Sequence, residues 1–73
     1  MAETIQAEMN ANVWKILVAP GDSVEEECPL MILESMKMEI PVLAESEGFV
    51  VALHVAEGDR VSPGQPLVDL STN

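Results

Sequence analysis

The stretch that decides the fold is "VWKILVAPGDSVEEECPLMILES", Val13 to Ser35, because the chain contains a second version of it. Moved by 50 − 13 = 37 positions, it lies without a gap over "VVALHVAEGDRVSPGQPLVDLST", Val50 to Thr72. Nine of the 23 aligned positions are identical: Val13/Val50, Val18/Val55, Ala19/Ala56, Gly21/Gly58, Asp22/Asp59, Val24/Val61, Pro29/Pro66, Leu30/Leu67 and Leu33/Leu70. An ungapped match of this length predicts two copies of one structural unit.

Each copy begins with apolar residues at every second position, which predicts a strand with one buried face. The residues expected on that face are Trp14, Ile16 and Val18 in the first copy and Val51, Leu53 and Val55 in the second. Trp14 is therefore expected in the core. The opposite face of the same strands carries Lys15 and His54, which we expect to be solvated.

Turns and short strands follow at matching places in the two copies. Gly21 and Gly58 lie in "PGD" and "EGD", where a positive φ would be costly for other residues. Val24 and Val61 come next, as anchors of short strands. A proline then opens an apolar run in each copy, so the last strand is expected to begin at the proline.

Two units of about 23 residues cannot bury their apolar faces alone, but they can when packed face to face. The fold class expected is all-β, a flattened barrel or sandwich of two β-units related by an approximate two-fold axis. No stretch has a convincing helical period. The whole chain, 1–73, is expected to form one domain with an ordered core from about 5 to 71.

The repeat also locates Lys37. The first copy ends near Ser35 and the chain continues, whereas the second copy ends near Thr72 and the chain stops at Asn73. Under a two-fold axis these two places lie at opposite ends of the domain. Lys37 is therefore expected on a hairpin tip, remote from both termini.

Composition narrows the function and the partners. The 73 residues carry 13 acids against three bases, a net charge of −10, and this surface would repel nucleic acid and anionic membranes. A chain this short favours a binding or carrier module over an enzyme with a deep cleft. Cys28 stands alone, so no internal disulfide can form, and neither a leader nor an apolar run of about 18 residues is visible. We expect a cytoplasmic protein that is monomeric when isolated.

The segment "ESMKMEIPVLAESEGFV", Glu34 to Val50, together with the two "GD.V" turns, resembles the biotinyl/lipoyl attachment domains. The small stand-alone biotin carboxyl carrier-like proteins are the most similar forms, and the resemblance runs from about Ile5 to Ser71. It implies the barrel-sandwich hybrid fold and a Lys37 that is biotinylated by a biotin protein ligase. It further implies a non-catalytic carrier, on which biotin takes a carboxyl group from biotin carboxylase to a carboxyltransferase.

The flanks of Lys37 suggest how such a ligase recognises it. Met36 and Met38 are flexible and polarizable, and they would form an apolar collar around the tip. Lipoyl domains of this superfamily typically carry Asp-Lys-Ala at the tip, so methionine on both sides favours biotin over lipoate.

Three further residues complete the expected recognition segment. Glu34, Ser35 and Glu39 bracket the Met-Lys-Met core. The two acids place negative charge beside Lys37, which we expect the ligase to displace before the amine reacts.

Two other functions stay open. The domain could be a lipoyl carrier for acyl transfer, or accept both groups, or it could be an interaction module whose Lys37 is never modified. His54 and Cys28 do not have the spacing of a metal site, and no nucleophile triad or phosphate loop is present. One departure from the family's pattern is Ala11, where glycine is usual, so Asn10 or Asn12 is expected in the left-handed region of the first turn.

Overall fold

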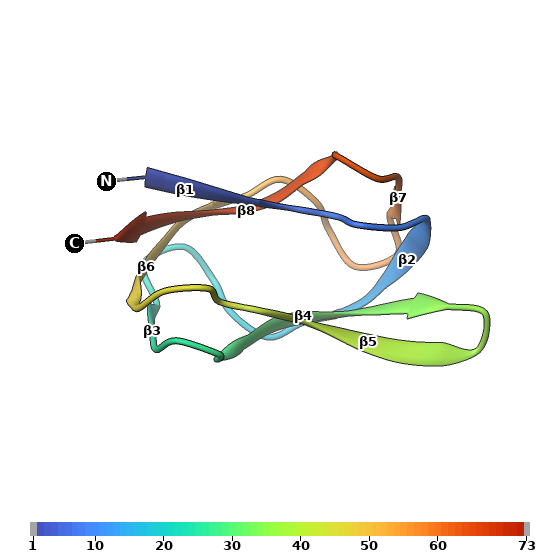
Figure 1. Cartoon of the computed structure of the whole chain (residues 1–73), viewed down its shortest axis with the longest axis horizontal. Helices are drawn as coiled ribbons and strands as arrows, with labels where there is room; N and C mark the ends of the chain where they lie inside the picture. The colour runs from blue at the N-terminus through green and yellow to red at the C-terminus, as the bar shows by residue number, and fades with distance from the viewer. Residues whose placement is uncertain (1, 73) are drawn as a thin grey trace.

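The computed structural model describes residues 2–72, so Met1 and Asn73, the two ends of the predicted domain, lie outside the described residues. Between Ala2 and Thr72 every regular element is a β-strand (Figure 1). The strands are β1 (Ala2–Gln6), β2 (Ala11–Ile16), β3 (Ser23–Val24), β4 (Pro29–Ser35), β5 (Met38–Leu43), β6 (Gly48–Leu53), β7 (Arg60–Val61) and β8 (Pro66–Thr72). Residues 2–72 include no helix of the length and apolarity that crossing a membrane requires.

Two four-stranded antiparallel sheets make up the domain, in the orders β1-β8-β6-β3 and β5-β4-β2-β7. We call residues 2–35 the first unit and residues 39–72 the second unit. Shifted by 37 residues, β1 to β4 of the first unit fall on β5 to β8 of the second. Each sheet therefore holds two strands from each unit. The predicted all-β barrel-sandwich is confirmed, but its units interlock and do not form one sheet each.

The turns hold the two units together. Gly21 and Gly58 have φ of 96° and 94°, which confirms the backbone expected for the repeated turn. The Gly21 amide donates to the Val50 carbonyl at 2.7 Å, and the Gly58 amide donates to the Val13 carbonyl at 2.7 Å. Each unit thus hydrogen-bonds its turn to the strand of the other unit, which makes it difficult for one unit to fold alone.

The core lies between the sheets and takes matching residues from both units. Its largest fully buried side chains are Leu30, Met31, Leu67, Leu70, Val13, Val61 and Val68. Each of these burials contributes about 1.5–3 kcal/mol to folding. Val24 and Val61 are buried as the repeat predicts, and β4 and β8 begin at Pro29 and Pro66. None of the described polar or charged residues is buried.

Two matching β-bulges correct the prediction for the first long strand of each unit. In β2 the pair Val13↔Leu33 is followed by Lys15↔Ile32, so Trp14 has no partner across the ladder. The extra residue reverses the alternation of faces. Val13 is buried and Trp14 is 44% exposed, so the placement of Trp14 in the core was wrong. The Lys15 amine lies 5.8 Å from the centre of the Trp14 ring.

The second unit has the same bulge. In β6 the pair Val50↔Leu70 is followed by Ala52↔Asp69, which leaves Val51 unpaired and 54% exposed. The predicted face is therefore wrong before each bulge and correct after it. Beyond the bulge, Ile16, Val18, Leu53 and Val55 are buried or half-buried.

Candidate functional site

Lys37 lies in the turn of the β4–β5 hairpin. Ser35↔Met38 is the last paired position, which leaves Met36 and Lys37 as a two-residue turn. Figure 1 places this turn at one end of the long axis, with both chain ends at the other. The domain is elongated, with extents of 35 × 18 × 17 Å, so a turn at the end of the long axis is far from most of the other residues. The hairpin tip remote from the termini is where the repeat predicts it.

The turn has a backbone that non-glycine residues seldom adopt. Met36 has φ of 53° and Lys37 has φ of 67°. Positive φ at both central residues is the mark of a type I′ turn, which favours Asn-Gly. A residue with a Cβ costs about 1–2 kcal/mol in this region, and such strain gathers at functional sites. The chain keeps two long side chains where the turn would favour small residues.

Three long side chains project from the tip into solvent. Met36 is 89% exposed and Met38 is 59% exposed, with the exposed Lys37 between them. A methionine exposed to this degree adds no core packing, so folding does not explain its presence. Two apolar arms beside one amine offer a recognition surface for a second protein.

The two acids that were expected beside Lys37 are cross-strand neighbours of each other, and neither forms an ion pair with the lysine. Glu34 and Glu39 are direct cross-strand partners of β4 and β5. The one ion pair found within residues 2–72 is His54–Asp69, so neither glutamate pairs with Lys37. Like charges directly opposite on neighbouring strands are destabilising, which makes the Glu34–Glu39 pair costly for the fold. The displacement of this charge by a ligase stays a prediction.

The two glutamates belong to a row that crosses the whole sheet. The register pairs Glu39 with Glu34, Glu34 with Asn12, and Asn12 with Arg60, which takes one residue from each of β5, β4, β2 and β7. All four are exposed. The charge along the row changes from two acids through an amide to a base.

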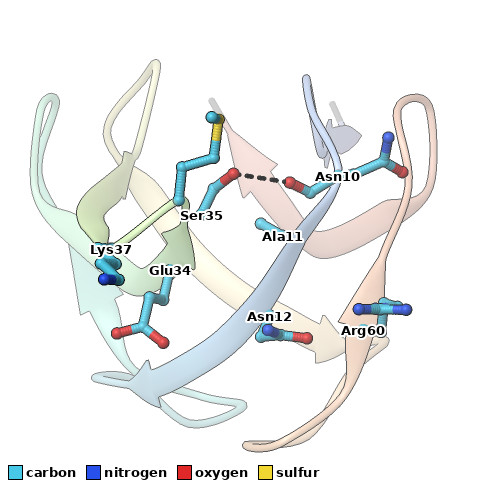
Figure 2. A pocket seen from close by; sticks show the side chains of 8 residues that line it. Asn10, Ala11, Asn12, Glu34, Ser35, Lys37 and Arg60 are labelled. Atoms are coloured by element: carbon cyan, nitrogen blue, oxygen red, sulfur yellow. Dashed lines mark hydrogen bonds between the residues drawn. The ribbon is translucent and has the colours of Figure 1, made fainter.

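A groove of about 380 Å³ lies beside this row and reaches Lys37 (Figure 2). Its lining residues are Asn10, Ala11, Asn12, Glu34, Ser35, Met36, Lys37 and Arg60. The Ser35 hydroxyl donates to the Asn10 carbonyl at 3.1 Å, which fastens the base of the hairpin to the loop before β2. The groove brings together predicted site residues on β4 and the turn with residues from two other strands.

Sequence reasoning missed Asn12 and Arg60 as neighbours of the tip. Both could have been found, because the repeat sets the register and Arg60 is one of only three bases. The prediction for the first turn was wrong: the non-glycine residues with positive φ in the described chain are Glu27, Met36 and Lys37, and neither Asn10 nor Asn12 is among them.

Polar side chains far from the tip form one more cluster. Asp69 accepts a hydrogen bond from the Thr4 hydroxyl at 2.8 Å and lies 2.9 Å from Nε2 of His54. Both contacts favour the carboxylate, first Thr4 and then His54, so the pKa of Asp69 is held below its ordinary value. In residues 2–72, no three His, Cys, Asp or Glu side chains come together as a metal site would require.

Comparison with known proteins gives a consistent assignment. The family model described as "biotin-requiring enzyme" matches residues 1–70. The chain is 43% identical over 70 residues to the biotin/lipoyl attachment protein of Bacillus subtilis, covering 96% of each chain. It is 44% identical over 70 residues to the biotin carboxyl carrier protein of Streptococcus mutans, covering 96% of this chain and 54% of that protein.

The solved structures agree with the sequence relatives. The crystal structure of the Kluyveromyces lactis urea carboxylase contains a domain that superposes with a TM-score of 0.91 at 32% identity. The superposition covers 97% of this chain and 6% of that enzyme. The fold, the hairpin lysine and these relatives lead to one conclusion: the chain belongs to the biotinyl/lipoyl attachment family.

Proposed function

We propose that this protein is a biotin carboxyl carrier, in which the amine of Lys37 is joined to biotin through an amide bond. The observation that carries the proposal is the exposed lysine between two exposed methionines, on a strained two-residue turn at the far end of the domain. The family is described as biotin-requiring, and relatives named as biotin carriers and carboxylases support the choice of group.

The residues present fit a covalently attached biotin. An acylated lysine needs an accessible amine without a competing ion pair, and Lys37 has no ion pair with the described acids. The turn lies at one end of the long axis and Lys37 is exposed, so a ligase and two further enzymes can reach the amine in succession. Biotin, when bound, supplies the ring nitrogen that holds the carboxyl group.

The protein itself contributes position and recognition, and not catalysis. The short hairpin fixes the base of the arm, while the lysine chain beyond Cα supplies its movement. Met36 and Met38, with Glu34, Ser35 and Glu39 behind them, form the surface that a biotin protein ligase would read. Biotin carboxylase and carboxyltransferase are the partners that the carrier would then visit, with the cytoplasm as its compartment.

Lipoate is the second candidate group. The Bacillus subtilis relative is named for attachment of both groups, which is the observation in favour of this alternative. The same amine and the same arm would serve acyl transfer.

The mass of the intact protein, purified from its own host, tests these proposals. We expect a gain of one biotinyl group, which is lost in Lys37→Arg and kept in the matched control Lys15→Arg. A lipoyl-sized gain would assign the protein to acyl transfer. An unmodified mass, in cells whose other carriers are fully biotinylated, would contradict the carrier function and favour an unmodified interaction module.

A further inference from the structure

The two units differ at the position beside the groove that reaches Lys37. In the second unit, Gly48 pairs with Thr72, and a Cβ at Gly48 would stand 2.1 Å from the Ser71 carbonyl oxygen. Strands in that unit can approach only because position 48 has no side chain. The corresponding residue of the first unit is Ala11, and there the β2–β4 ladder begins at Asn12↔Glu34. Alanine for glycine thus accompanies an opening between β2 and β4, next to the lysine.

We propose that this groove is a resting site for the ureido ring of the biotin carried on Lys37. The inference rests on the proposed function, and it assigns to Glu34, Asn12 and Arg60 a role in holding the ring between deliveries.

The lining matches the chemistry of a cyclic urea. Such a ring presents two N–H donors and one carbonyl acceptor. A carboxylate only accepts hydrogen bonds and a guanidinium only donates them, while an asparagine amide does both. Glu34 can therefore accept from the ring N–H groups and Arg60 can donate to the ring carbonyl. The amides of Asn10 and Asn12 can bond to either kind of ring atom. The dithiolane ring of lipoate has no N–H and no carbonyl to use these groups.

The register sets the spacing of these partners. Glu34, Asn12 and Arg60 occupy one cross-strand row, so acceptor and donor stand two strands apart, about 10 Å at the backbone. Long side chains from both ends can close on a ring lying between them. Figure 2 shows Glu34 on the Lys37 side of the groove and Arg60 on the opposite side.

The charges also favour the site once the lysine is acylated. Amide formation removes the positive charge of Lys37, which leaves Arg60 as the one cation lining the groove. Arg60 forms no ion pair with any of residues 2–72, so its donors are available. Because Glu34, Asn12 and Arg60 are exposed, the ring is held weakly and can leave when a partner enzyme arrives.

The rate at which streptavidin captures the biotinylated protein measures how much of the biotin is free. A ring docked for about three-quarters of the time would slow capture roughly fourfold, because only the undocked fraction binds. We expect Arg60→Gln to speed capture about threefold. Lys15→Gln is the matched control, since it removes the same charge at a residue that does not line the groove; we expect it to leave the capture rate unchanged.

Nuclear magnetic resonance supplies a second readout that needs no variant. Biotinylation should shift the Arg60 Nε–H signal and the side-chain amides of Asn12 and Asn10, while the Lys15 and Gln65 side-chain signals stay in place. Intact mass on the same sample verifies that Lys37 carries biotin.

The outcomes distinguish the resting site from the carrier function. Shifts at Arg60 and faster capture in Arg60→Gln support the resting site. A biotinylated protein without these shifts, or equal capture rates for wild type and both variants, overturns the resting site and leaves the carrier function intact. A Lys37 that no biotin protein ligase modifies overturns both.

Discussion

The two units share a backbone and differ in the segment after their last strand. In both, an aspartate side chain closes the first turn: Asp22 accepts from the Ala19 amide and Asp59 from the Ala56 amide, each at 2.9 Å. Only the first unit then continues into Met36 and Lys37, whereas the second ends beside the N-terminal strand. The repeated part therefore builds the frame, and the hairpin joining the units carries Lys37.

The outer faces of the two sheets also differ at places that the repeat relates. The second unit's Asp69 and His54 and the neighbouring Thr4 form a hydrogen-bonded cluster on one sheet. Shifted by 37 residues, the same three places on the other sheet hold Ile32, Leu17 and Pro41, which are apolar. At these three places the sheet that carries the lysine hairpin is therefore the more apolar one, and Leu17 there is 50% exposed.

The largest effect that separates the units is expected at Gly48 and Ala11. Gly48→Ala should lower the free energy of unfolding by about 3 kcal/mol, because its Cβ would collide with the backbone oxygen of Ser71. Ala11→Gly, at the corresponding place, should cost only about 0.5–1 kcal/mol through backbone entropy. Urea unfolding of the unmodified protein measures both. Equal losses in the two variants would show that β2–β4 and β6–β8 are packed alike at this point. That result would contradict the difference between the two ladders, of which only β6–β8 pairs at this position.

The sequence predicted the features that the two units have in common. Identical turn glycines, buried valines and strand-opening prolines gave the all-β class, the two-fold arrangement and the position of Lys37. Each depends on local backbone preference or on the repeat, both of which the sequence displays.

Features that depend on cross-strand pairing are harder to predict, because the pairing has to be worked out from the repeat before any neighbour can be named. A β-bulge adds one residue without any composition signal, so Trp14 and Val51 were assigned to the wrong face. The groove combines Asn12, Glu34 and Arg60, which meet only through cross-strand pairings. The left-handed Glu27, in a run of acids, gave no sign of its backbone.

A smaller effect is expected at Glu27 and Gly64, which are matched turn residues with φ of 69° and 87°. Glu27→Gly should raise the free energy of unfolding by about 0.5–1 kcal/mol, since relief of left-handed strain exceeds the entropy cost of glycine. Gly64→Ala should lower it by about 1–2 kcal/mol, because a Cβ meets no neighbour there and only φ is unfavourable. Urea midpoints measure both changes, and a loss of stability in Glu27→Gly would mean that the Glu27 side chain stabilises its turn.

The smallest effect concerns acid, and it tests the polar cluster of Thr4, His54 and Asp69. Hydrogen bonds from Thr4 and then His54 lower the pKa of Asp69 in the folded protein, so the unfolded chain binds a proton at higher pH than the folded one. The stabilisation from Asp69 is therefore present above the ordinary aspartate pKa, and it is lost as the pH falls through the lower pKa of the folded state. We expect the urea midpoint of wild type to fall more steeply between about pH 5 and pH 2 than that of Asp69→Asn.

Thr4→Val refines this last test, because it removes the larger of the two causes and leaves His54 in place. Its acid slope should lie between those of wild type and Asp69→Asn. Ile32→Val, at the place in the first unit that corresponds to Asp69, changes no titrating group and should keep the wild-type slope. If Thr4→Val instead matched wild type, the stabilisation of the Asp69 carboxylate would come from His54 alone. The hydrogen bond from Thr4 on β1 to Asp69 on β8 would then have no effect on the pH dependence of stability. The acid dependence of stability therefore tests whether the Thr4–Asp69 hydrogen bond between β1 and β8 is the main source of the lowered pKa of Asp69.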